Sequence, residues 1–212
     1  MKTRSSIPDF IDTVGRAISR ARWSIITIAA TYAVSILVGI VMVHTGNSYA
    51  LNRRDQIVNQ ANQQSATMQA ANRGQDLRAA LSDFAGNLFV GAVPKTISGF
   101  TVVFPYPLVA YQGWVGGIVS VRGDHTSRFN DSRPAFYYLL TLLLQIIPYS
   151  LAVGAGVNAG IACFRPATYY QGEKWFGFYP KEALRDILRI YTLVPLLFLL
   201  ASLWEFLSPW NF

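Results

Sequence analysis

The chain has little of what metal proteins and enzymes use. Its 212 residues include one cysteine, Cys163, and two histidines, His44 and His125. One cysteine forms neither an internal disulfide nor a thiolate cluster, and two histidines so far apart give no metal-ligand spacing. No phosphate-binding glycine loop, acid–base pair or Ser-His-Asp pattern is evident. We therefore predict no catalytic residue, no metal site, no cofactor and no enzyme activity.

Charged residues are also scarce. They make up 14% of the chain, against roughly 25% in soluble domains, while hydrophobic residues make up 52% and the mean hydropathy is +0.29. This composition predicts an integral membrane protein. The formal net charge is +7, but the Lys and Arg residues lie in short flanks beside apolar runs, where they set orientation and contact anionic lipid. Nucleic acid is not an expected partner.

Apolar runs long enough to cross a hydrocarbon core predict about five spans. The predicted transmembrane helices are 23–43, 84–104, 106–122, 135–163 and 189–208, the fourth with a kink near Pro148. Residues 1–22 are predicted as a cytoplasmic amphipathic helix, 44–83 as a polar extracytoplasmic helical arm, and 164–188 as a cytoplasmic loop with another amphipathic helix. The predicted fold class is all-α, a polytopic transmembrane helical bundle.

Three of these segments allow a second interpretation. Residues 1–22 either lie on the membrane surface or form a soluble helix that leads into the first span. The arm 44–83, rich in Asn, Gln and Ala, either docks a partner or is a solvated spacer. Pro105 and Pro107 break the run 84–122, which favours two spans joined by a tight turn because proline ends helices. The alternative is one span followed by a re-entrant segment.

The distribution of basic residues predicts the orientation. With the N-terminus in the cytoplasm, the inside segments carry ten Lys and Arg residues and the outside segments carry seven. This bias agrees with the positive-inside rule, although the long 44–83 loop counts for less. We therefore expect a cytoplasmic N-terminus.

Polar groups inside a bilayer are costly, so each one calls for an explanation. In the predicted spans they are Asn87, Lys95, Gln112, Gln145, Asn158 and Glu205. Lys95 lies near the middle of its span, at a depth similar to that of Gln145, so these two side chains could meet. Lys95 either forms part of a polar cavity or ligand site, or it snorkels or donates to backbone carbonyls freed by Pro94.

The other polar residues are assigned simpler roles. Glu205 lies close to the outer interface, where it can face water. We interpret Gln145 and Asn158 as interhelical hydrogen-bond partners, each worth about 1 kcal/mol. A proton relay needs carboxylates or histidines in series at depth, and we find none in the predicted spans, which disfavours proton-coupled transport.

Small residues recur at spacings that let membrane helices approach closely. The predicted packing residues are Gly113, Gly116, Gly117, Gly154, Gly156 and Gly160. Lipid provides no hydrophobic drive between helices, so tight association depends on such contacts. The pattern predicts either a compact core or an interface between subunits, including a homo-oligomer.

Three segments of the second half share a pattern of Gly, Pro and a few polar residues. They are NLFVGAVPKTISGF (87–100) with the Gln112-Gly113 and Gly116-Gly117 pairs after it, LLLQIIPYSLAVGAGVNAG (142–160), and VPLLFLLASLWEFLSP (194–209). In this order they resemble the stage II sporulation protein M (SpoIIM-like, DUF95) family of membrane proteins. Gln145 stands where that family has an acidic residue, and Leu140-Thr141-Leu142 replaces its Pro-His-Gly.

The resemblance implies a prokaryotic cytoplasmic-membrane protein with partners, since the sporulation member of the family is a scaffold for a peptidoglycan-degrading complex. Our first hypothesis is a non-enzymatic scaffold or accessory subunit that holds other membrane or envelope proteins. The second is a small permease or lipid-handling protein with a polar cavity around Lys95, Asn87 and Gln145. The expected partners are membrane lipid, membrane or envelope proteins and a second copy of the chain.

Overall fold

A computed structural model describes residues 7–165 and 167–210. It is 81% helical, which confirms the all-α prediction. The first six residues of the predicted amphipathic helix 1–22 lie outside the described part. Four helices of the bundle are α1 (Ile7–His44), α6 (Pro105–Ile118), α7 (Ser132–Phe164) and α9 (Val194–Leu207).

The remaining elements complete the described chain. They are α2 (Ser48–Gln64), α3 (Ala66–Asn72), α4 (Asp76–Ala85), the π-helix η1 (Gly86–Ala92), α5 (Val93–Ser98), α8 (Lys181–Ile190), the 3-10 turns η2 (Gly99–Thr101), η3 (Arg128–Asn130) and η4 (Thr168–Tyr170), and the strands β1 (Lys174–Trp175) and β2 (Tyr179–Pro180). The antiparallel β1–β2 hairpin is a feature that the sequence analysis missed, because two-residue strands carry no periodic signal.

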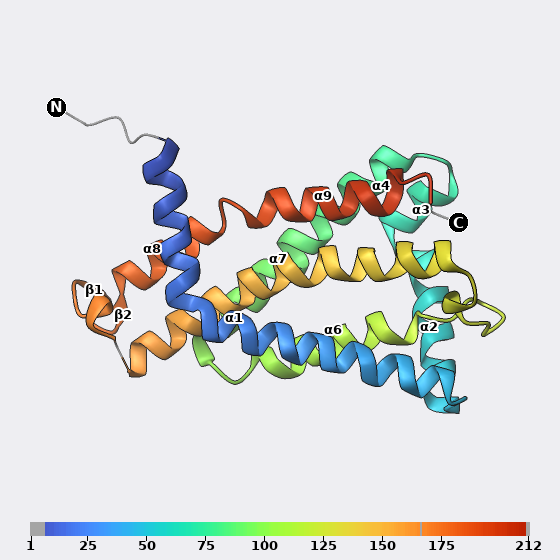
Figure 1. Ribbon diagram of the computed structural model, residues 1–212, viewed down its shortest axis with the longest axis horizontal. Coiled ribbons are helices and arrows are strands. Elements are labelled where there is room, and N and C mark those ends of the chain that lie inside the picture. The colour runs from blue at the N-terminus through green and yellow to red at the C-terminus, as the bar shows by residue number, and fades with distance from the viewer. Residues whose placement is uncertain (1–6, 166, 211–212) are drawn as a thin grey trace.

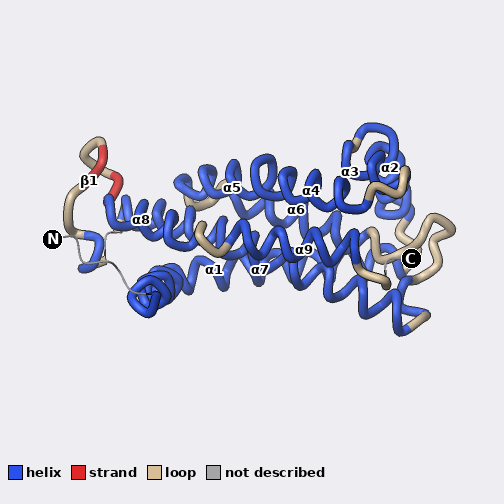
Figure 2. The backbone as a smooth tube through the Cα atoms, turned by 90° about the horizontal axis from the view of Figure 1, so that it is seen from above, coloured by secondary structure: helices blue, strands red, loops and turns tan. Residues whose placement is uncertain are grey.

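The helices form one elongated bundle. Figure 1 shows α6, α7, α9 and the C-terminal part of α1 lying along its long axis, with the continuous run α4–η1–α5 behind them, while the N-terminal part of α1 bends away across this axis. The arm helices α2 and α3 lie at one end, which we call the arm end, together with the loop 119–131. The β-hairpin and α8 lie at the opposite end, the hairpin end, and Figure 2 shows the same separation from above.

Three stretches are long and apolar enough to cross a membrane. They are Asp9–His44, Ser132–Phe164 and Lys181–Leu207, which contain most of the predicted spans 23–43, 135–163 and 189–208. The predicted spans 84–104 and 106–122 do not reach this standard. The helix α6 has 14 residues, about 21 Å at 1.5 Å per residue, which is less than a hydrocarbon core of roughly 30 Å.

Several element boundaries differ from the predicted ones. Residues 7–44 form one continuous helix instead of two separate ones, although Figure 1 shows that this helix bends sharply between its N-terminal and C-terminal parts. The arm ends at Gly74, whose φ of +68° suits glycine, and α4 begins at Asp76 instead of near residue 84. Its polar residues concealed this helix start, yet Ala79 and Ala80 are fully buried in the bundle.

Two local features were predicted within the apolar runs, a turn near Pro105 and a kink near Pro148. The chain reverses between α5 and α6 at Val102, which adopts a φ of +66°, and α6 then begins at Pro105. This agrees with the predicted turn. Helix α7 continues through Pro148, where the kink was predicted.

The glycines of α6 let that helix approach α1. An added Cβ at Gly113 would lie 2.6 Å from the carbonyl oxygen of Tyr32, and one at Gly117 would overlap the carbonyl oxygen of Ile36. Gly116 is less restricted, since its nearest neighbour would be the Leu142 side chain at 3.3 Å. Backbone contact of this kind requires residues without a side chain.

The glycines of α7 have the same role against two other elements. An added Cβ at Gly154 would lie 2.6 Å from Ile25 Cα of α1, and one at Gly160 would lie 2.6 Å from the carbonyl oxygen of Gly99. At Gly156 it would overlap the backbone of α5. These glycine faces are therefore occupied within the chain.

We predict that Gly156→Ala destabilises the folded protein by about 1–3 kcal/mol, because its methyl group has to displace the backbone of α5. Gly15→Ala is the matched control. It also lies within a helix, nothing lies within 4 Å of its added Cβ, and alanine there is expected to stabilise by about 0.5–1 kcal/mol. Thermal unfolding of both variants in one detergent checks this. Equal melting temperatures would contradict the packing assigned to Gly156.

Candidate functional site

A cluster of polar side chains joins three helical segments inside the arm half of the bundle. We call it the carboxylate cluster, and its members are Asp83, Asn87, Gln145, Tyr149, Ser202 and Glu205. The six residues come in three pairs, one from each segment: Asp83 with Asn87, Gln145 with Tyr149, and Ser202 with Glu205. A spacing of three or four residues places both side chains of a pair on one face of the helix. Four of the members are only partly exposed, and Tyr149 and Ser202 are buried.

Asp83 connects α4 with α9 and with η1. Its Oδ2 accepts hydrogen bonds from Ser202 Oγ at 2.7 Å and from Asn87 Nδ2 at 2.8 Å. Asn87 Oδ1 in turn accepts from the Tyr149 hydroxyl at 2.8 Å. The sequence analysis missed Asp83, because it lay in the segment assigned to the arm. Its spacing of four residues from Asn87 is the signal that could have found it.

Glu205 does not simply face water, as the sequence suggested. Its Oε2 accepts a hydrogen bond from Gln145 Nε2 at 2.8 Å, and its side chain lies partly buried between α9 and α7. The Tyr137 hydroxyl donates to its backbone carbonyl. Together with Asp83, Glu205 places two carboxyl groups in a region where the sequence analysis found no series of ionisable groups.

The π-helix η1 shapes the wall of this cluster. Asn87 lies in η1, and single π-helical turns within α-helices are frequent at functional sites. An added Cβ at Gly91 would overlap the Tyr149 hydroxyl and lie 3.1 Å from its Cε1. Glycine at position 91 therefore makes room for the tyrosine that donates to Asn87.

Lys95 contacts an aromatic ring and a carbonyl, and it does not meet Gln145. Its Nζ lies 3.4 Å from the Gly91 carbonyl oxygen and 5.0 Å from the centre of the Tyr149 ring. Ammonium groups are attracted to aromatic faces at this distance. The second interpretation of Lys95, a donor to backbone carbonyls, describes this geometry, although Pro94 would free a carbonyl one residue earlier than the one that Lys95 uses.

The two remaining polar candidates lie apart from one another. The Gln112 side chain lies beside the hydroxyls of Tyr32 and Tyr149, and its Oε1 is buried without a hydrogen-bond partner in the described part of the chain. Asn158 Nδ2 donates to the Tyr170 hydroxyl at 2.8 Å, in a second network at the hairpin end.

This second network surrounds Asp186, which is 2% exposed. Arg20 of α1 donates to both carboxylate oxygens, with Nε at 2.6 Å from Oδ2. Arg189 donates at 2.7 Å and the Tyr170 hydroxyl at 2.9 Å. The sequence analysis did not identify this role of Arg20, which joins α1 to α8.

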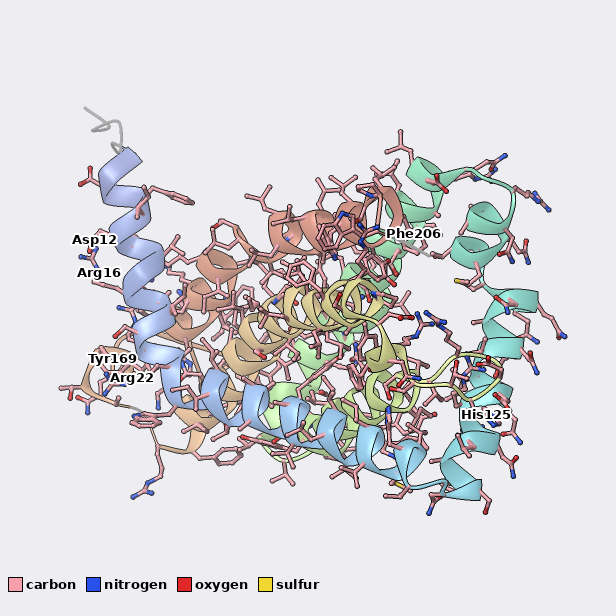
Figure 3. All side chains as sticks on the ribbon, turned by 45° about the vertical axis from the view of Figure 1, so that its right-hand side comes forward. Asp12, Arg16, Arg22, His125, Tyr169 and Phe206 are labelled. Carbon is pink, nitrogen blue, oxygen red and sulfur yellow. The ribbon has the colours of Figure 1, made fainter. Side chains whose placement is uncertain are left out.

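A third network holds the loop 119–131 against the arm. His125 Nε2 lies 2.9 Å from Asp55 Oδ2, and Arg54 Nη1 donates to Asp55 Oδ1 at 2.9 Å. The hydrogen bond from Arg54, and then that of His125, hold the pKa of Asp55 below its usual value. Arg54 also donates to the Val121 carbonyl at 3.2 Å. Figure 3 labels His125 at this end and Arg22 and Tyr169 at the other.

The chemistry available at these sites is hydrogen bonding and charge pairing. Among residues 7–165 and 167–210, no group of three or more His, Cys, Asp or Glu side chains could hold a metal ion. The carboxylate cluster could take up or release a proton, or hold a small polar group.

Comparisons with known proteins were made at three levels. No family model, no curated protein and no solved structure matches this chain. The resemblance to the stage II sporulation protein M family therefore stays a prediction.

We predict that Arg20→Met costs about 3 kcal/mol of stability, because it leaves the Asp186 carboxylate buried without its bidentate partner. Arg16→Met is the control. Arg16 pairs with Asp12 on the exposed side of the same helix, with side chains 58% and 62% exposed, and such pairs are worth about 0–1 kcal/mol. Chemical unfolding in detergent compares the two. Similar losses in both variants would contradict the role given to the Asp186 network.

Proposed function

We propose that this protein is a non-enzymatic, multi-pass membrane scaffold or accessory subunit of an envelope-associated complex. It crosses the prokaryotic cytoplasmic membrane with the hairpin end and N-terminus in the cytoplasm and the arm outside. We include among the crossing segments α4–η1–α5 and also α6, although α6 alone is shorter than a hydrocarbon core.

The observation that carries the proposal is that the packing glycines and most of the polar groups of the bundle contact other parts of the same chain. The glycines of α6 and α7 contact backbone of the same chain, and most of the intramembrane polar candidates bond to side chains or carbonyls of the same chain. Because these groups are paired within the chain, it is the outer surface of the bundle that is open to other molecules. That surface is apolar along α1, with Val34, Leu37 and Val41 exposed, and polar on the arm.

We also propose a relationship to the stage II sporulation protein M family, and the three segments that carry the resemblance meet in this structure. Asn87 from the first resembling segment, Gln145 and Tyr149 from the second, and Ser202 and Glu205 from the third meet in the carboxylate cluster. Gln145, which stands where the family has an acidic residue, bonds to the glutamate of the closing segment.

The outer face of the arm is the surface we assign to a partner. Asn59, Gln60 and Gln63 are exposed there, and polar surfaces can bind a partner through hydrogen bonds. The experiment is purification of the tagged full chain in a gentle detergent, followed by mass spectrometry. We expect a stoichiometric membrane or envelope protein, and we expect Asn59→Arg/Gln63→Arg to lose it while melting at an unchanged temperature.

Gln171→Arg, an exposed change at the hairpin end, is the control and should retain the partner. A chain that purifies alone in detergent and in lipid nanodiscs would contradict the scaffold proposal. Partner binding that is unchanged in the Asn59→Arg/Gln63→Arg variant would contradict it as well.

The carboxylate cluster favours a second candidate, a small permease. Asp83 and Glu205 bring two carboxyl groups into the bundle together with two amides. A permease would lose transport in proteoliposomes when Asp83→Asn keeps the shape and removes the charge, while the complex stays intact. If the protein is a scaffold, the wild type and Asp83→Asn should form the same complex, and neither should transport a solute.

A further inference from the structure

The hairpin end carries a groove whose two halves differ in chemistry. It has a volume of about 240 Å³, and its lining residues are Trp175, Lys181, Leu184, Arg185 and Leu188. Two cations and three apolar side chains thus face one small space between the β-hairpin and α8. A ligand that fills it has to combine an anionic group with a hydrocarbon part.

The Asp186 network fixes which side of α8 lines this groove. Ala183, Asp186 and Ile190 face the bundle and are buried, and Arg20 holds Asp186 in place. The opposite side of α8 therefore turns outward, where Leu188 is 69% exposed. The orientation of α8 that lines the groove is therefore fixed by contacts with the bundle.

The two cations are only loosely neutralised by the chain itself. Lys181 Nζ lies 2.7 Å from Glu173 Oε2, but Glu173 is 79% exposed, and Arg185 lies 3.4 Å from Glu182. The exposed Lys181–Glu173 pair is worth about 0–1 kcal/mol, and Arg185, itself 64% exposed, shares the half-buried Glu182 with Arg189, so a phosphate group can replace both carboxylate contacts. Lys181 and Arg185 are four residues apart on one helix, which places both within reach of one anion.

The surroundings of the groove are apolar and exposed. Phe176 and Phe178 of the hairpin are 82% and 52% exposed, and Trp175 is 56% exposed. Large exposed apolar surface marks contact with a membrane or a protein, and aromatic side chains gather where membrane meets water. The apolar helix α9 begins four residues after α8 ends, which sets α8 at the membrane surface.

We infer that this groove binds an acidic phospholipid of the surrounding membrane. Its phosphate lies between Lys181 and Arg185, and an acyl chain follows Leu184 and Leu188 beside Trp175. The inference rests on the membrane placement proposed above. A free phosphate would leave the apolar half empty, and basic pockets at the cytoplasmic side of membrane helices suit anionic headgroups.

Native mass spectrometry of the full chain in detergent tests this site. The protein is titrated with phosphatidylglycerol or with phosphatidylcholine of the same acyl chains. We expect the wild type to retain phosphatidylglycerol about tenfold better, and Lys181→Gln/Arg185→Gln to retain the two lipids equally. Arg73→Gln/Arg78→Gln is the control. It removes the same charge from exposed positions at the arm end and should behave as the wild type.

A second variant tests the apolar half. Leu188→Gln leaves the charges in place and should lower retention of phosphatidylglycerol, while binding of inorganic phosphate stays weak. Unchanged lipid selectivity in Lys181→Gln/Arg185→Gln would overturn the inference, and so would inorganic phosphate that binds as tightly as the lipid. A chain that alkaline carbonate releases from membranes would instead contradict the membrane placement, which separates the two failures.

Discussion

Close contact between helix backbones at glycine residues determines how this bundle is built. Helices in lipid gain nothing from hydrophobic association, so they depend on close packing. The central helix α7 uses Gly154 against α1 and uses Gly156 and Gly160 against the segment formed by α5 and η2. Because these contacts leave no room for a Cβ, they set the rotation and depth of α7, and with them the positions of Gln145 and Tyr149 on the same helix.

Polar networks then fix the two ends of the bundle. The Asp186 network joins α8 to α1 at the hairpin end, and the carboxylate cluster joins α4, α7 and α9 in the arm half. Both are built from side chains whose hydrogen bonds are worth more because they are withdrawn from water. The fold therefore combines close backbone packing, which sets the position of α7, with polar pairing, which joins α8 and α9 to the other helices.

Some of this structure could be predicted from the sequence. The runs 23–43, 135–163 and 189–208 lie in stretches apolar and long enough to cross a membrane. Asp83 escaped prediction because hydropathy averages over a window, so its polar neighbours hid a helix that packs on α9. Glu205 was assigned to water because its partner Gln145 is distant in sequence, and the ion pair between Arg20 and Asp186 escaped prediction for the same reason.

Threading of the bundle through a bilayer is tested most directly by labelling single cysteines in cells. In a Cys163→Ala background, Gln60→Cys marks the arm and Gln171→Cys marks the hairpin end, both at exposed positions. A bundle that spans the membrane gives labelling of Gln60→Cys by an impermeant maleimide in cells with intact inner membranes, and labelling of Gln171→Cys only after permeabilisation. Equal labelling of both positions in intact cells would contradict the proposed topology.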